Sequence, residues 1–476
     1  MNIASIKNSF KNSPVLRNFS LLTVSNIFTQ VLGIVTIIKI RLFASTTVFS
    51  TYNLLQQHVV VFVAIASFGL NNVVVRMVSR DRLNSKKIFI TSLILKAAIL
   101  LISILIYVIY YSFFVTSYGG YPFLLTILSI IFISLNDNVE GVAFGLERME
   151  FSSVISFAVN LLWIIILLLV PGKFYTLNVL FEIYFILFAL KTTVYIIALN
   201  KAKCLTGIYS NKDWKDSANG MLQQALPFYY LALLTIISNQ VPPLFLERRA
   251  GVEQFNLFFI ANKLLSPMNL ILSTALISLF PNLAKLFVEN NELFLKRIKS
   301  IFVIISLLGI MGAFAVTFFR SEVVLLIYGK KYIGSALVLS YQCWYMCLYA
   351  LVCLIGTLLG AIDRQKELSY LAVICTSFQV PILWFGAKYG AEYLSAAFLA
   401  ATVLVFILHV AAIIKFLNNA IKIWFFVKIF SFLAVAYTIS VLIPAGLSLS
   451  LKSVIFASIS VTGLLILRQK IKAVKG

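Results

Sequence analysis

Long apolar runs recur along the chain about every 25–40 residues, and this repetition constrains the fold more than any other feature. Each run, at about 1.5 Å per residue in a helix, can cross a hydrocarbon layer of about 30 Å. Because that layer offers the backbone no hydrogen-bond partners, only helices and closed barrels cross it. The 476 residues are 61% hydrophobic and 12% charged, a balance foreign to soluble domains of this size. The sequence therefore predicts an all-α polytopic membrane protein.

Fourteen of these runs qualify as membrane spans, so about 14 transmembrane helices are expected. They lie at roughly 19–42, 52–75, 88–113, 121–144, 152–171, 177–199, 222–246, 255–286, 297–319, 335–361, 367–386, 393–417, 424–444 and 449–468. The connections between them are short. The longest, at about 200–221, is polar and charged and lies near the middle of the chain, which makes it the candidate linker between two halves.

Basic residues alternate in density between the two sides of the predicted bundle. With the N-terminus inside, 26 of the 39 lysines and arginines fall on the inner side and 10 on the outer side. The other three, Lys96, Lys191 and Lys263, lie within spans. The positive-inside rule then places both termini in the cytoplasm. Since most of the net charge of +23 follows from topology, it does not indicate nucleic acid as a partner, whereas membrane lipids are expected partners.

A short internal match indicates two halves of the same topology. Gly145 is followed by the pair Glu147–Arg148, and Gly360 by the pair Asp363–Arg364, at the ends of the fourth and tenth spans. Parallel repeats of this kind are typical of transporters. The expected domains are an N-lobe at 1–200, a cytoplasmic linker at 201–221, a C-lobe at 222–418, and two C-terminal helices with a basic tail at 419–476.

The eighth span carries a polar stripe on an otherwise apolar helix. Its members, spaced by four, three and four residues, share one face: Asn262, Ser266, Asn269 and Ser273. Lys263 lies beside the stripe, and a lysine within a span usually faces a cavity or a partner. Two readings stay open. Either the helix lines a polar chamber that binds substrate, or Lys263 reaches the interface while the small polar residues pack against a neighbour.

The first span repeats this pattern. Asn26, Gln30 and Gly33 share a face that Arg41 continues toward the outer end, so Asn26 and Gln30 are predicted to line the chamber and Arg41 to bind substrate. Lys39 lies off that face and is a weaker candidate.

Lys96 and Lys191 add cations to the first half. Asp137 and Glu140 in the fourth span either pair with such cations or bind a coupling proton or cation. A chamber richer in cations than in acids favours an anionic substrate, because lysine and arginine bind phosphate by charge and hydrogen bonds.

The sequence contains no Walker A, G-x-S-x-G or H-E-x-x-H motif and no metal-spaced cluster of cysteine and histidine. We therefore expect no catalytic residues, no metal and no cofactor. His409, among apolar neighbours, is interpreted as a packing histidine rather than a proton relay.

Several stretches resemble the polysaccharide-transporter branch of the multidrug/oligosaccharidyl-lipid/polysaccharide exporter superfamily. They include the first-span run with the FSTYNLL that follows it, LPFYY at 226–230, A-N-K-L with Pro267, F-P-N-L at 280–283, I-Y-G-K-K-Y at 327–332 and K-Y-G-A at 388–391. Together they cover most of residues 15–417. Within that branch the chain is most similar to O-antigen or capsule repeat-unit flippases.

The resemblance implies two six-helix lobes in a V-shaped arrangement around a cavity that opens alternately to each side. It implies movement of an undecaprenyl-pyrophosphate-linked oligosaccharide across a bacterial inner membrane, alongside polysaccharide polymerase and assembly proteins. Lys263 and Arg41 match basic cavity positions of related flippases. The sequence departs from the pattern at 237–241, where relatives often carry an aspartate, and in the first span, which lacks the ion-binding aspartate of drug exporters.

Other functions stay open on the sequence alone. The first is a flippase for another lipid-linked precursor, of peptidoglycan or teichoic acid type. A drug–cation antiporter fits less well, because the spans contain few acids. A membrane-bound polysaccharide polymerase would need an external catalytic loop, and the external connections here are short.

Overall fold

The computed structural model describes residues 14–114, 119–202, 204–206 and 214–442. Every regular element in these ranges is an α-helix or a short 3₁₀-helix. Within these described ranges, thirteen helical segments are long and apolar enough to cross a membrane. The predicted class, an all-α polytopic membrane protein, is confirmed, and the count is close to the fourteen expected. The predicted fourteenth span at 449–468 lies outside the described residues.

The chain divides into two compact units, Met1–Val241 and Pro242–Gly476, which are described separately below. The helix Trp214–Asn239 (α9) belongs to the first unit because it packs on helices of that unit. The sequence-based boundary at 201–221 would assign this helix to the C-lobe instead. The predicted lobes therefore stay a prediction.

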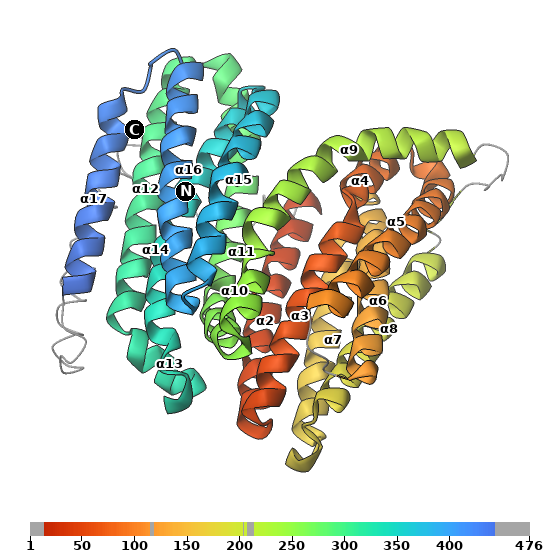
Figure 1. Ribbon diagram of the computed structural model, residues 1–476. Helices are drawn as coiled ribbons and strands as arrows, with labels where there is room; N and C mark the ends of the chain where they lie inside the picture. Colours follow the sequence, from red (N-terminus) through yellow and green to blue (C-terminus); the bar gives the residue numbers. More distant parts are fainter. Residues whose placement is uncertain (1–13, 115–118, 203, 207–213, 443–476) are drawn as a thin grey trace, which may run out of the picture. The chain divides into compact units, whose positions relative to one another are not determined.

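The first unit is a bundle in which Gly120–Gly145 (α6) contacts most of the other helices (Figure 1). Around it lie Thr46–Ser67 (α3), Leu70–Arg80 (α4), Ser85–Phe114 (α5) and Leu177–Lys201 (α8). Pro14–Phe43 (α2) packs along Met149–Leu169 (α7), while α9 lies on α3, α4 and α5. Short 3₁₀-helices occupy Arg82–Asn84 (η1) and Gly172–Phe174 (η2).

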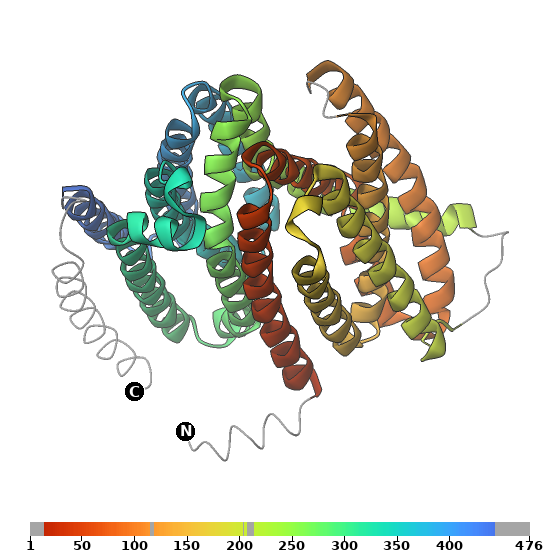
Figure 2. The ribbon, with the colours of Figure 1, turned by 90° about the horizontal axis from the view of Figure 1, so that it is seen from below.

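The second unit is built around Ser335–Ala361 (α14), of which most residues are buried. It packs against Val252–Glu289 (α11), Asn291–Phe318 (α12) and Ala391–Phe416 (α16), and Gln365–Ala387 (α15) lies on α16. Pro242–Ala250 (α10) contacts α11 and α15, and Ile423–Leu442 (α17) contacts α12. Arg320–Tyr328 (α13) and Lys330–Tyr332 (η3) precede α14. Figure 2 shows the helices of each unit side by side.

Several helices begin at residues whose side chains satisfy a free backbone N–H. The side chain of Ser45 accepts a hydrogen bond from Val48 N before α3, and that of Thr176 accepts one from Val179 N before α8. Asn290 accepts one from Leu293 N at 2.9 Å before α12. Serine, threonine and asparagine are preferred at this position because the first N–H groups of a helix lack partners within it.

The internal repeat proposed from the sequence recurs as the same backbone turn in both units. Glu147 and Asp363 are both left-handed, with φ of 61° and 59°. In each turn the following arginine donates its N–H to a carbonyl five residues earlier, Arg148 to Ala143 and Arg364 to Leu359, both at 2.8 Å. Such hydrogen bonds close the end of a helix. The repeat therefore reflects two helices, α6 and α14, that end in the same way.

Two predicted spans are interrupted. The predicted span 52–75 contains a break, because Phe68 and Gly69 are both left-handed, with φ of 48° and 67°, between α3 and α4. Within the predicted span 222–246, helix α9 ends at Asn239, before the two prolines with which α10 begins. Proline disfavours the helical conformation of the residue before it, so this second break follows from the sequence.

Gly69→Ala is expected to destabilise the protein by about 1–3 kcal/mol. A Cβ on Gly69 would lie 2.9 Å from Phe228 Cβ and 3.0 Å from Tyr229 N of α9, in addition to the left-handed backbone. Gly33→Ala on α2 is the matched control, because nothing lies within 4 Å of its added Cβ. Thermal unfolding of the purified variants checks the prediction, and equal midpoints for the two would contradict it.

Candidate functional site

The polar stripe predicted on the eighth span lies on a face of α11 that neighbouring helices leave uncovered. Asn262, Asn269 and Ser273 are exposed, whereas Ser266 is half-buried. The adjoining side of the helix carries the buried residues Phe258, Ala261 and Leu265. The polar residues share one face because they recur at intervals of three and four positions. An exposed amide is costly against lipid, so this face requires water or a polar ligand in a membrane.

Pro267 changes the backbone hydrogen bonding of α11 in the middle of the stripe. Proline has no N–H, so the carbonyl of Lys263, four residues earlier, lacks its usual helical donor. The Ser266 hydroxyl donates to this Lys263 carbonyl at 2.9 Å. The helix therefore continues through Pro267 without an unsatisfied carbonyl.

Lys263 is half-buried beside the stripe, and its ammonium lies 5.2 Å from the centre of the Phe259 ring. In the part of the chain that the structure describes, no carboxylate lies within ion-pair distance of Lys263. Contact with an aromatic face is worth about 0.5–2 kcal/mol, less than full hydration of the charge. This lysine is therefore a cation whose charge is available to a ligand.

The candidates on α2 lie between the middle and the C-terminal end of that helix. Arg41 and Lys39 are both half-buried, and the Lys39 ammonium lies 4.1 Å from the centre of the Phe43 ring. Asn26 and Gln30 are half-buried nearer the other end of α2. The adjacent Ser25 hydroxyl donates to the Ser153 carbonyl of α7, which fixes the rotation of α2 against its neighbour.

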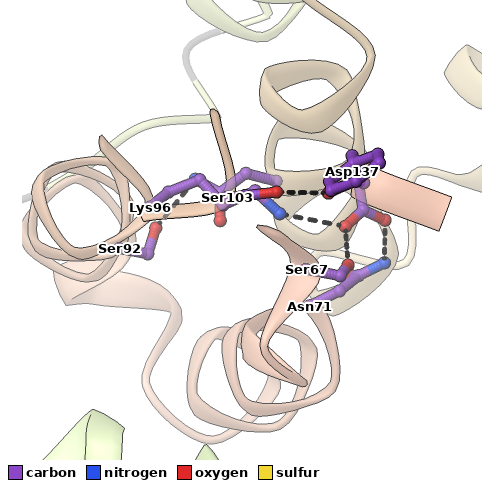
Figure 3. Close-up of polar contacts among 8 residues, drawn as sticks. Ser67, Asn71, Ser92, Lys96, Ser103 and Asp137 are labelled. Carbon is purple, nitrogen blue, oxygen red and sulfur yellow. Dashed lines mark hydrogen bonds and ion pairs between the residues drawn. The ribbon is translucent and has the colours of Figure 1, made fainter. Parts of the chain in front are cut away.

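Lys96 and Asp137 form an ion pair inside the first unit, shown in Figure 3. Lys96 on α5 is 1% exposed, and its Nζ lies 3.3 Å from Asp137 Oδ2 on α6. Ser67 donates to the same oxygen at 2.6 Å, and Asn71 donates to Oδ1 at 2.8 Å. Of the two alternatives for these residues, the structure contains the pairing. The carboxylate is held by donors from α3 and α4, on both sides of the break at Phe68–Gly69.

Glu140 and Lys191 also influence each other, without forming an ion pair in the described part of the chain. Glu140 lies one turn beyond Asp137 on α6 and accepts a hydrogen bond from the Ser152 hydroxyl of α7. Lys191 on α8 is half-buried and interacts electrostatically with Glu140. Lys96 therefore pairs with one carboxylate of α6, and Lys191 interacts electrostatically with another.

Ser67, Asn71 and Gly141 belong to the Asp137 cluster but were not singled out from the sequence. A Cβ on Gly141 would lie 2.3 Å from Asn71 Oδ1, so glycine is needed where Asn71 approaches α6. Ser67 and Asn71 lie on the two sides of the stretch F-G-L at 68–70. Polar residues on both sides of a glycine within an apolar span are the signal that would have indicated a break.

The remaining polar candidates agree with packing roles. His409 Nδ1 lies 2.8 Å from the Val405 carbonyl of its own helix. The five cysteines are all free. Among the described residues, no group of three or more histidine, cysteine or acidic side chains is arranged to hold a metal ion.

Solved structures with the same fold are membrane transporters. The lipid II flippase MurJ in an inward closed conformation matches with a TM-score of 0.70 and 14% identity, over 94% of this chain and 98% of that one. A mutant of the Vibrio cholerae MATE transporter VcmN matches with a TM-score of 0.58 and 14% identity, over 87% and 98%. A superfamily transporter from Pyrococcus furiosus matches with a TM-score of 0.57 and 12% identity, over 89% and 97%. At these identities the likeness concerns the fold.

The family comparison is more specific. No curated protein matches the sequence. The model of the family described as "Polysaccharide biosynthesis protein" matches residues 15–287, more than half of the chain. The match includes the first-span candidates, the Asp137 cluster and the polar stripe of α11. The chain therefore belongs to the polysaccharide biosynthesis protein family, within the multidrug/oligosaccharidyl-lipid/polysaccharide exporter superfamily of multi-pass membrane transporters.

Proposed function

We propose that the protein is a flippase that moves an undecaprenyl-pyrophosphate-linked oligosaccharide, an O-antigen or capsule repeat unit, from the cytoplasmic to the periplasmic leaflet. Transport proceeds by alternating access through a cationic cavity. The observation that carries the proposal is Lys263, a half-buried lysine without a carboxylate partner among the described residues, beside the exposed amides of Asn262 and Asn269. A pyrophosphate would supply the negative partner for the charge of this lysine, and the two amides can form hydrogen bonds with sugar hydroxyls.

Lys263 is proposed to contact the pyrophosphate, and Arg41 and Lys39 to provide further positive charge. The sugars are proposed to pass the polar side chains of the two helices: Asn26, Gln30, Asn262, Ser266, Asn269 and Ser273. Lys96 and Lys191 are expected to contribute less directly, because the acids of α6 oppose their charges.

The same distribution of charge argues against a cationic substrate. Asp137 is engaged by Lys96, Ser67 and Asn71, and Glu140 by Ser152, so neither carboxylate is free to bind a cationic drug. An anionic lipid-linked substrate is favoured for this reason. We place the protein in the bacterial inner membrane with both termini in the cytoplasm, where the polymerase and assembly proteins of the polysaccharide are its expected partners.

Complementation of a bacterial strain that lacks its O-unit flippase tests this function. The full-length chain is expected to restore surface polysaccharide. In liposomes, the purified protein is expected to flip an undecaprenyl-pyrophosphate-linked oligosaccharide without changing it chemically. Preferred flipping of lipid II or a teichoic acid precursor would replace the proposed substrate, and formation of polymer would replace the proposed activity.

A further inference from the structure

A polar pocket lies within the first unit, apart from the residues discussed above. It has a volume of about 400 Å³ and opens where the end of α4, the 3₁₀-helix η1, the start of α5 and the first half of α9 meet. Pockets of about 300–1,000 Å³ are typical of small-molecule sites. Its polar lining consists of Arg80, Asp81, Asn84, Lys87, Thr91, Ser217 and Gln224.

Two cations line this pocket against a single carboxylate, Asp81, and neither cation is held in an ion pair within the described residues. Arg80 is exposed and Lys87 is half-buried, and neither forms an ion pair within the described ranges. The acid in the lining, Asp81, is occupied, because it accepts hydrogen bonds from the backbone N and the side-chain amide of Asn84 at 3.2 and 2.8 Å. The neighbouring Arg82 pairs instead with Glu147 at 2.6 Å. Asp81 thus shapes the loop, and the pocket keeps an excess of positive charge.

Two uncharged groups add hydrogen-bond donors. Thr91 belongs to the pocket lining and is fully buried, and its hydroxyl has no hydrogen-bond partner among the described residues. Gln224 accepts a hydrogen bond from Arg76 at 2.7 Å through Oε1. Since arginine only donates, the other end of this amide is its NH₂ group and is left to donate. The pocket also lies at the start of α5, where the helix dipole favours negative charge.

An exposed apolar residue precedes Asn84 of the pocket lining in the chain. Leu83, in η1 between Arg82 and Asn84, is 79% exposed and is among the most exposed large apolar side chains of the described chain. Met77, Ile88 and Met221 form the apolar part of the pocket wall. A cationic pocket next to an exposed leucine matches a ligand with an anionic head and an apolar tail. The pocket also lies on the side to which the basic-residue count assigns the cytoplasm, where anionic lipids and basic residues attract each other.

We propose that this pocket binds the phosphate of an anionic phospholipid headgroup. Arg80 and Lys87 contact the phosphate oxygens, Thr91 and Gln224 donate to the same group, and Leu83 enters the acyl region. The bound lipid is a resident of the membrane and not the transported substrate, so the proposal does not depend on the proposed function. By joining α4, α5 and α9, the lipid is expected to stabilise the first unit.

Lipid titration of the purified full-length protein tests the proposal. Phosphatidylglycerol or phosphatidylcholine is added to the protein in detergent, and the unfolding midpoint is followed. Phosphatidylglycerol is expected to raise the midpoint, and phosphatidylcholine to have little effect. In Arg80→Gln combined with Lys87→Gln, the apparent Kd for phosphatidylglycerol is expected to rise about tenfold. Lys86→Gln is the matched control, because Lys86 is exposed, adjacent in sequence and outside the pocket.

Thr91→Val provides a second variant that changes shape little and removes only the hydroxyl. It is expected to weaken phosphatidylglycerol binding about threefold without lowering the midpoint in phosphatidylcholine. Equal Kd values for the wild type, the double variant and Lys86→Gln would overturn the site. Equal stabilisation by glycerol phosphate or inorganic phosphate, without lipid, would overturn the assignment to a lipid headgroup.

Discussion

Lys263→Ala is expected to reduce export of the polysaccharide repeat unit by about tenfold to a hundredfold while the protein still reaches the membrane. A hydrogen bond to a charged group contributes about 1.5–3 kcal/mol, which corresponds to this range if Lys263 contacts the pyrophosphate. Lys263→Arg keeps the charge and is expected to retain most of the activity. Surface polysaccharide in the complemented strain, normalised to the amount of protein in the membrane, measures the effect.

Lys285→Ala on the same helix is the matched control for this experiment. Lys285 is exposed and interacts with Glu289 at 3.7 Å near the end of α11, so its removal is expected to leave export unchanged. If Lys263→Arg were as damaging as Lys263→Ala, the lysine would act by packing, as in the second reading of this helix. Normal export in Lys263→Ala would exclude its contact with the substrate.

Separating Lys96 from Asp137 is expected to destabilise the first unit by about 3–5 kcal/mol, because either single change leaves an uncompensated charge among buried groups. Lys96→Met leaves the carboxylate, and Asp137→Asn leaves the ammonium, which is 1% exposed. The double variant removes both charges and is expected to be more stable than either single variant. Unfolding of the purified proteins in detergent, followed by tryptophan fluorescence, measures the change.

The exposed pair Arg82–Glu147 serves as the control for this prediction. Both side chains are at least half exposed, so Arg82→Gln is expected to cost less than about 1 kcal/mol. Additive effects of Lys96→Met and Asp137→Asn would contradict a coupled pair.

The double variant also separates the two roles considered for Asp137. Restored stability with restored transport indicates a structural pair, whereas restored stability without transport indicates ion coupling.

Most of the fold could be predicted from the sequence because the hydrophobicity of a span is a local property. The spans at 335–361 and 393–417 differ by at most two residues from α14 and α16. The end of α9 before Pro242 also had a local signal. The break between α3 and α4 had a weaker signal, the polar residues on both sides of Gly69, and Phe68 there adopts a left-handed conformation that its residue type disfavours. Asp137, nearly seventy residues away, accepts hydrogen bonds on both sides of this break.

At the candidate site, too, some features could be predicted from the sequence and others depend on packing. The polar stripe of α11 is of the first kind, and the partners of the interior lysines are of the second. Residues three and four apart share a helix face whatever surrounds them, so the stripe beside Lys263 was determined by the sequence. The partner of a charge depends instead on which helices pack together and how each is rotated. Lys96 meets Asp137 across two helices, while Lys263 meets an aromatic ring of its own helix. The sequence by itself determined the helices, their polar faces and the family. Only the tertiary structure decided which lysines have an acid beside them, because electrostatic attraction depends on distance in space and not on position in the chain.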